Sequence, residues 1–170
     1  MKKKLAIIGA GIAGLTSAYI VRKAEGNWLE FILPDWFLYS TVTIISSSVL
    51  LIIARFYINK EKPIIQLVLT TFLLGVLFSY FQFRGWQELT MQGVFLTGEG
   101  SNVAGSFLYV ITLAHLVHLL GGLIALVVTL INARAGRYTS NNYLGFELTS
   151  NYWHFLGLLW VYLFFFLRFF

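Results

Sequence analysis

Five stretches of the chain lack every Asp, Glu, Lys and Arg and are dominated by apolar side chains. They cover residues 5–21, 36–54, 63–83, 100–133 and 148–167, and they are 17 to 34 residues long. A helix needs about 20 apolar residues to cross about 30 Å of hydrocarbon, so each stretch can form a membrane span. None alternates with the period of two that the strands of a transmembrane barrel show. The pattern therefore predicts an all-α integral membrane protein, a five-transmembrane-helix bundle forming one domain over residues 1–170.

The polar residues around these stretches set the expected helix ends. We expect helices at about residues 4–23, 36–57, 63–84, 104–132 and 146–169. The longest connection, residues 84–102, mixes apolar and polar side chains. We expect it to form an amphipathic segment that lies in the membrane–water interface on the outer side of the membrane. The first helix follows three lysines and resembles the apolar part of a signal peptide, but Thr16-Ser17-Ala18 is a poor cleavage site, which favours a retained helix.

The composition narrows the class of protein further. Apolar residues make up 58% of the chain and charged residues 11%, against about a quarter in ordinary soluble domains, which argues against a soluble enzyme. Cysteine is absent, so disulfides, thiolate nucleophiles and cysteine-ligated metal clusters are excluded. The net charge of +5 is spread thinly and does not indicate a nucleic-acid surface.

The basic side chains are divided unequally between the two ends of the predicted bundle. The amino-terminal side would carry Lys2, Lys3, Lys4, Arg55, Lys60, Lys62, Arg134 and Arg137, and the opposite side Arg22, Lys23, Arg84 and Arg168. Because cytoplasmic loops carry the excess of Lys and Arg, we expect a cytoplasmic amino terminus and a periplasmic carboxyl terminus in a bacterial inner membrane. Arg134 and Arg137 are also candidates for phospholipid headgroup contacts.

A glycine motif near the amino terminus has two interpretations. Residues 9–14 match G-x-G-x-x-G, which opens the dinucleotide-binding sites of flavin and nicotinamide oxidoreductases. Those sites need further strand–helix units to build their sheet, and here the chain runs into membrane spans instead. We therefore favour a helix-packing stripe of small residues at Ala10, Gly14 and Ala18, four residues apart.

Ionisable side chains inside membrane spans are candidates for function. His115 and His118 lie three residues apart in the fourth predicted helix and should share a face, while Glu147 and His154 lie early in the last. Two histidines on one face cannot clamp one haem iron from opposite sides, so ligation by this chain is disfavoured. We predict a structural polar cluster of His115, His118, Glu147, Trp153 and His154, held by hydrogen bonds between helices or to a partner. No catalytic, cofactor-binding or metal-binding residue is predicted.

Several segments together resemble subunit III of the haem–copper terminal oxidases, most closely that of cytochrome c oxidase. They are Trp86-Gln87-Glu88-Leu89, residues 105–112, 115–122 and 142–147, and Tyr152-Trp153-His154-Phe155, in the order and spacing of the family. The resemblance covers roughly residues 66–170. Residues 13–20 resemble the third helix of seven-helix members, which suggests a short five-helix form. Two departures are the absence of an acid in residues 5–21 and Gly157, where the family often has an aspartate.

The resemblance implies an accessory, non-catalytic subunit of a proton-pumping respiratory cytochrome c oxidase. Haem and copper would lie in partner subunits I and II, and this chain would stabilise subunit I and hold phospholipid near the oxygen and proton entry routes. A larger respiratory assembly is a further implied partner. The same subunit of a quinol oxidase is the nearest alternative, and a membrane-bound dinucleotide-dependent oxidoreductase is a more distant one.

Overall fold

The computed structural model describes residues 33–94, 103–140 and 142–169, which form four long helices. They are α2 (Trp36–Asn59), α3 (Ile65–Met91), α4 (Val103–Arg134) and α5 (Leu144–Phe169). By length and composition, each of the four can cross a membrane. An all-helical membrane bundle is thus supported. The predicted first helix and its stripe at Ala10, Gly14 and Ala18 lie outside the described residues, so the count of five helices is not confirmed.

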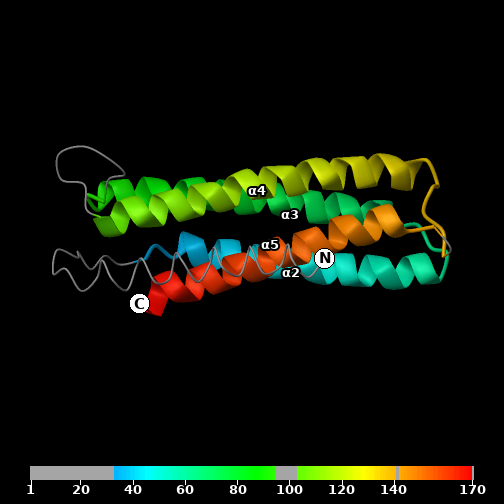
Figure 1. Ribbon diagram of the computed structural model, residues 1–170, viewed down its shortest axis with the longest axis horizontal. Coiled ribbons are helices and arrows are strands. Elements are labelled where there is room, and N and C mark those ends of the chain that lie inside the picture. Colours follow the sequence, from blue (N-terminus) through cyan, green and yellow to red (C-terminus); the bar gives the residue numbers. More distant parts are fainter. Residues whose placement is uncertain (1–32, 95–102, 141, 170) are drawn as a thin grey trace, which may run out of the picture.

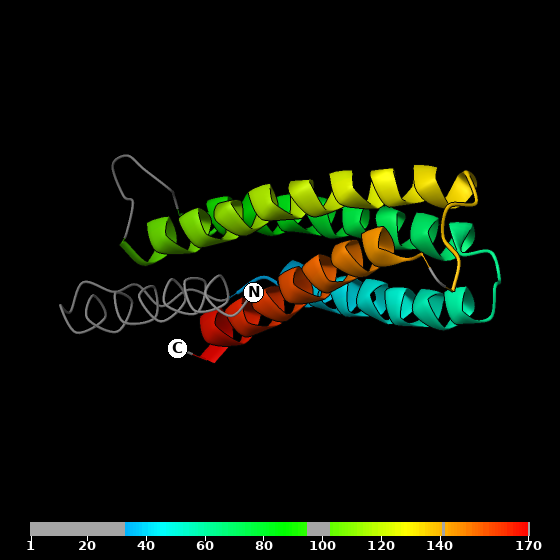
Figure 2. The ribbon, with the colours of Figure 1, turned by 45° about the vertical axis from the view of Figure 1, so that its right-hand side comes forward.

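The four helices lie side by side along the bundle (Figure 1), and α2 and α3 make the most extensive contact. Figures 1 and 2 show α3 beside α4 and α5 beside α2, with the α2–α3 and α4–α5 connections at the same end. Each helix packs against two neighbours, α2 against α3 and α5, and α4 against α3 and α5. The chain therefore runs up and down the bundle, and the last turns of α2 and α4 meet the first turns of α3 and α5 at the end that holds these two connections (Figures 1 and 2).

The connection after α4 is short because the helix ends in a tight hydrogen-bonded turn. The N–H of Gly136 donates to the carbonyl of Ala133, and the N–H of Arg137 donates to the carbonyl of Asn132. These two bonds form a Schellman motif, whose turning residue takes a left-handed conformation. Gly136 has a φ of 65°, which glycine adopts without the steric cost of a Cβ atom.

Helix α3 is longer than the sequence predicts. It continues past residue 84 to Met91, so the predicted helix end at residue 84 is wrong. Residues 95–102 lie outside the described part, and the interfacial placement of residues 84–102 stays a prediction. Arg84 remains helical with its guanidinium 5.3 Å from the ring of Trp36, and Leu89 is fully buried. A charged residue ends an apolar stretch without breaking a helix, which is why the boundary was misplaced.

Trp153 of α5 fills the centre of the bundle and touches the three other described helices. Its indole N–H donates to the Oγ of Ser47 on α2 at 2.8 Å. A Cβ atom on Gly75 of α3 would lie 2.6 Å from the tryptophan ring, and one on Gly122 of α4 would lie 3.0 Å from it. The ring therefore occupies the space that side chains at these glycines would need.

Trp160 lies two turns further along α5 and makes a second contact with all three helices. Its indole N–H donates to the Oγ1 of Thr41 at 3.0 Å, and its ring stacks on Phe37 of α2 with centroids 6.0 Å apart. The ring also meets Phe78 of α3 edge-on at 5.1 Å and His115 of α4 at 5.2 Å. Aromatic side chains of one helix thus hold the core together.

Candidate functional site

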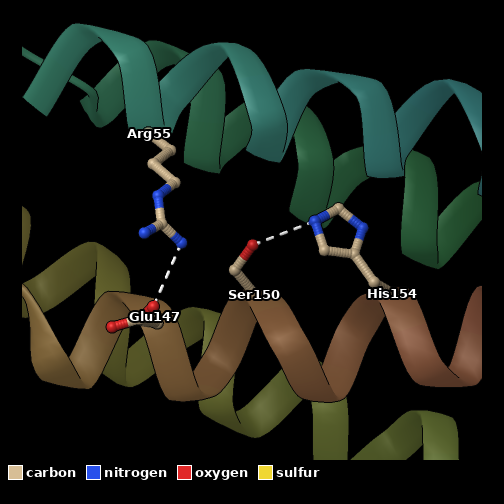
Figure 3. A network of polar contacts seen from close by, with 4 residues as sticks. All are labelled: Arg55, Glu147, Ser150 and His154. Carbon is tan, nitrogen blue, oxygen red and sulfur yellow. Dashed lines mark hydrogen bonds and ion pairs between the residues drawn. The ribbon is translucent and has the colours of Figure 1, made fainter.

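An ion pair joins α2 to α5 near the end of the bundle that holds the α2–α3 and α4–α5 connections. Nη1 of Arg55 lies 3.1 Å from Oε1 of Glu147, as Figure 3 shows. The guanidinium also lies 5.7 Å from the centre of the Tyr143 ring. The two charged side chains are 47% and 33% exposed, so solvent or headgroups reach both and the pair itself adds little stability.

Further along the same side of α5, Ser150 and His154 form a second polar contact. The Oγ of Ser150 lies 3.1 Å from Nε2 of His154, one helical turn away (Figure 3). A pocket of about 230 Å³ opens here between α2 and α5. It is lined by Leu51, Ile52, Arg55, Phe56, Asn59, Ser150, Asn151 and His154.

The pocket is lined by polar side chains and by apolar side chains. Arg55, Asn59 and Asn151 offer N–H donors, while Leu51, Ile52 and Phe56 offer apolar surface. A guanidinium carries five N–H donors, and the structure commits only its Nη1 to Glu147 among the described residues. Such a site can bind a molecule with an anionic head and an apolar tail.

The two neighbouring histidines of α4 have different surroundings, although the sequence suggests one shared face. His115 is 3% exposed and packs between Phe78 and Trp160. His118, three residues later, is exposed on the surface of α4. Three residues advance a helix by about 300°, and this 60° difference is enough to carry one ring into the core and leave the other outside.

The hydrogen bond of His118 fixes the roles of its ring nitrogens. Nδ1 lies 2.7 Å from the carbonyl oxygen of Ala114, and because a carbonyl only accepts, Nδ1 of the neutral ring carries the proton. Nε2 is therefore an acceptor on the exposed side of α4. Close by, the hydroxyl of Tyr152 on α5 donates to the carbonyl of His118 at 3.0 Å, which joins the two helices.

The five residues of the predicted polar cluster do not form one network in this structure. Glu147 pairs with Arg55, Trp153 with Ser47 and His154 with Ser150, while His115 is buried and His118 is exposed. Among the described residues, no group of three or more His, Cys, Asp and Glu side chains is arranged to hold a metal ion.

The arginines predicted to contact lipid headgroups lie at the end of the bundle that carries Arg55. Arg134 is exposed in the last turn of α4. Arg137 is exposed in the connection to α5, and its Nη1 donates to Oδ1 of Asn132 at 3.1 Å.

The pocket residues Asn59 and Asn151 are not predicted from the sequence. Their signal is that each lies one turn from a charged residue, Asn59 from Arg55 and Asn151 from Glu147.

Comparison with known proteins identifies close similarity to one membrane family. The profile of the family described as cytochrome c oxidase subunit III matches residues 31–170. The probable cytochrome c oxidase subunit 3 of Nocardia farcinica (strain IFM 10152) is 29% identical over 164 residues, covering 89% of this chain and 77% of that protein. The cytochrome c oxidase subunit 3 proteins of Loxodonta africana and Latimeria chalumnae are each 32% identical over 106 residues, covering 62% of this chain. The match spans only 38% of the length of each of these two animal proteins.

Proposed function

Because the chain belongs to the cytochrome c oxidase subunit III family, we propose that it is an accessory subunit of a proton-pumping respiratory cytochrome c oxidase. In this role it stabilises subunit I and holds phospholipid near the routes by which oxygen and protons enter. The haem and copper centres belong to the neighbouring subunits I and II. The chain's own contribution is a packed helical surface in the membrane.

The observation that carries this proposal is the exposed acceptor on α4. Nε2 of His118 lies in a helix long enough to cross the membrane, on a surface that also exposes Val117 and Leu120. A polar acceptor facing lipid tails has no donor to meet, whereas a neighbouring transmembrane helix can provide one. The exposed side of α4 is therefore suited to contact with another membrane subunit.

Purification of the oxidase through a tag on this chain tests the role. His118→Leu is expected to weaken retention of the chain in the complex by about 3- to 20-fold, the range given by interhelical hydrogen bonds of about 0.6 to 1.7 kcal/mol. The haem spectrum of the complex should be unchanged. Val117→Leu, an apolar change at the neighbouring exposed position, is the control and should retain the chain.

Loss of one haem's absorbance in the His118→Leu complex, with the chain still present, would show that His118 ligates iron and that the accessory role is wrong.

The pocket between α2 and α5 supports the lipid-holding part of the proposal. Its cationic and amide groups suit a phosphate, and its apolar wall suits the first part of an acyl chain. Arg134 and Arg137 add headgroup contacts at the same end of the bundle. The basic residues of both connections at this end also favour its placement on the cytoplasmic side of a bacterial inner membrane.

Arg55→Gln is expected to weaken retention of a phospholipid about fivefold, because one basic contact near the membrane surface contributes about 1 kcal/mol. Native mass spectrometry of the full chain, released from lipid vesicles into mild detergent, measures the retained lipid. Lys60→Gln makes the same change of charge on an exposed residue outside the pocket and should retain the lipid. Equal retention by the two variants would exclude the pocket as the headgroup site.

A further inference from the structure

Three polar atoms in the centre of the bundle have no hydrogen-bond partner among the described residues. They are Nδ1 and Nε2 of His115 on α4 and Oε1 of Gln82 on α3. His115 is 3% exposed and Gln82 is 1% exposed, so bulk solvent does not reach either side chain. A buried polar atom without a partner is costly, and native proteins resolve most such cases with a protein group or an ordered water.

The packing of α3 against α4 places Gln82 and His115 at similar positions along the length of the bundle. The indole N–H of Trp86 on α3 donates to Oγ1 of Thr112 on α4 at 3.1 Å, and Phe78 on α3 meets the ring of His115 at 5.8 Å. Gln82 lies one helical turn from both Phe78 and Trp86. The two contacts therefore place Gln82 opposite the stretch of α4 between Thr112 and His115.

Both side chains point into the interior of the bundle. Nε2 of Gln82 donates to Oγ of Ser40 on α2 at 2.9 Å, and that hydroxyl donates to the carbonyl of Phe37. The ring of His115 lies against Trp160 of α5, 5.2 Å away. The amide of Gln82 is thus held with its nitrogen toward α2 and its oxygen in need of a donor.

The chemistry of the three atoms fits water better than a metal ion. A neutral imidazole has one donor and one acceptor nitrogen, and Oε1 of Gln82 is an acceptor. A water molecule donates two hydrogen bonds and accepts two, so it can satisfy the amide oxygen together with either kind of ring nitrogen. A metal would need more ligands than one imidazole and one amide, and the described residues offer no cluster of three.

We propose that α3 and α4 form a buried hydration site in which an ordered water bridges Oε1 of Gln82 and a ring nitrogen of His115. The site lies in the core among Phe78, Trp160 and Ser40, apart from the pocket at Arg55 and from the exposed ring of His118. It hydrates the middle of the bundle without opening it to solvent.

An experimental structure of the full chain, purified in lipid with the subunits that remain attached, tests the site at a resolution that shows ordered water. We expect a density peak about 2.7 to 3.2 Å from both Oε1 of Gln82 and one ring nitrogen of His115. A direct hydrogen bond between the two side chains, or ordered side chains without a peak, would overturn the proposal.

Two variants give an independent readout in the same preparation. Gln82→Met removes the acceptor at similar length, and His115→Phe keeps a ring between Phe78 and Trp160 without its nitrogens. Each should lower the thermal midpoint of the chain, and the double variant should lower it by less than the sum, because the bridge is lost only once. Gln66→Met, an exposed change on the same helix, should leave the midpoint unchanged. Strictly additive losses together with an absent peak would show that the two side chains share no water.

Discussion

Trp153→Ala is expected to lower the free energy of unfolding by about 3 to 5 kcal/mol, the range found when large buried aromatic side chains are truncated. The ring is fully buried, its N–H is bonded to Ser47, and it lies against Gly75 and Gly122 on two other helices. Removing it leaves a cavity that opposing glycines cannot fill. The loss can be measured by denaturant titration of the full chain in mixed micelles, followed by far-ultraviolet circular dichroism.

Two other substitutions on α5 make this result specific. Leu158→Ala also truncates a large apolar side chain, but Leu158 is 71% exposed, so its effect should be small. Trp153→Phe keeps most of the ring and loses the bond to Ser47, so it should fall between the other two variants. If Trp153→Ala is as stable as Leu158→Ala, the ring does not hold the four helices together.

Gly75→Ala is expected to destabilise the bundle although alanine favours helix formation by about 1 kcal/mol over glycine. Its Cβ would lie 2.6 Å from Cη2 of Trp153 and 2.8 Å from Cδ2 of Leu123, which is closer than real Cβ contacts allow. The tryptophan is buried and hydrogen-bonded, so it cannot move aside without breaking other contacts. Overpacking of this kind costs about 1 to 3 kcal/mol. The same micelle titration measures the loss.

Gly121→Ala is the matched control for this prediction. Its Cβ would meet only the hydroxyl of Tyr152, at an ordinary distance of 3.5 Å, so the variant should be as stable as the parent or slightly more so. A Gly75→Ala chain at least as stable as the Gly121→Ala chain would show that the Trp153 ring does not approach α3 as closely as the structure indicates.

For the four helices that the structure describes, the sequence predicts the ends to within about two residues, except at the carboxyl end of α3. In α5 the charge-free stretch ends at residue 167 and the helix at Phe169, whereas α2 continues five residues past its stretch, to Asn59. In α3 the apolar stretch ends near Arg84, but the helix continues to Met91. The length of a charge-free stretch reflects the thickness of the hydrocarbon that a helix crosses. The length of the helix also depends on its neighbours, and here Trp36 contacts Arg84 and Thr112 contacts Trp86 in the additional turns of α3.

Of the candidate site, the sequence predicts Glu147 and His154 but neither their partners nor the pocket beside them. Glu147 and His154 could be singled out because ionisable groups in membrane spans are rare. That Glu147 pairs with Arg55 depends on α2 lying beside α5, and periodicity within one helix cannot show which helices are neighbours. The different surroundings of His115 and His118 have the same origin, since the neighbours of α4 decide which ring is covered.

The contacts of Trp153 and Trp160 also have a consequence for biosynthesis. Both side chains come from α5, the last of the four helices to leave the ribosome, and they fill spaces bounded by α2, α3 and α4. Until α5 is inserted, the hydroxyls of Ser47 and Thr41 lack their indole partners and the groove beside Gly75 and Gly122 is open. Quality-control proteases and insertion chaperones would therefore meet an incomplete bundle until α5 has been synthesised and inserted, and a nascent chain truncated before Trp153 should be short-lived in the membrane.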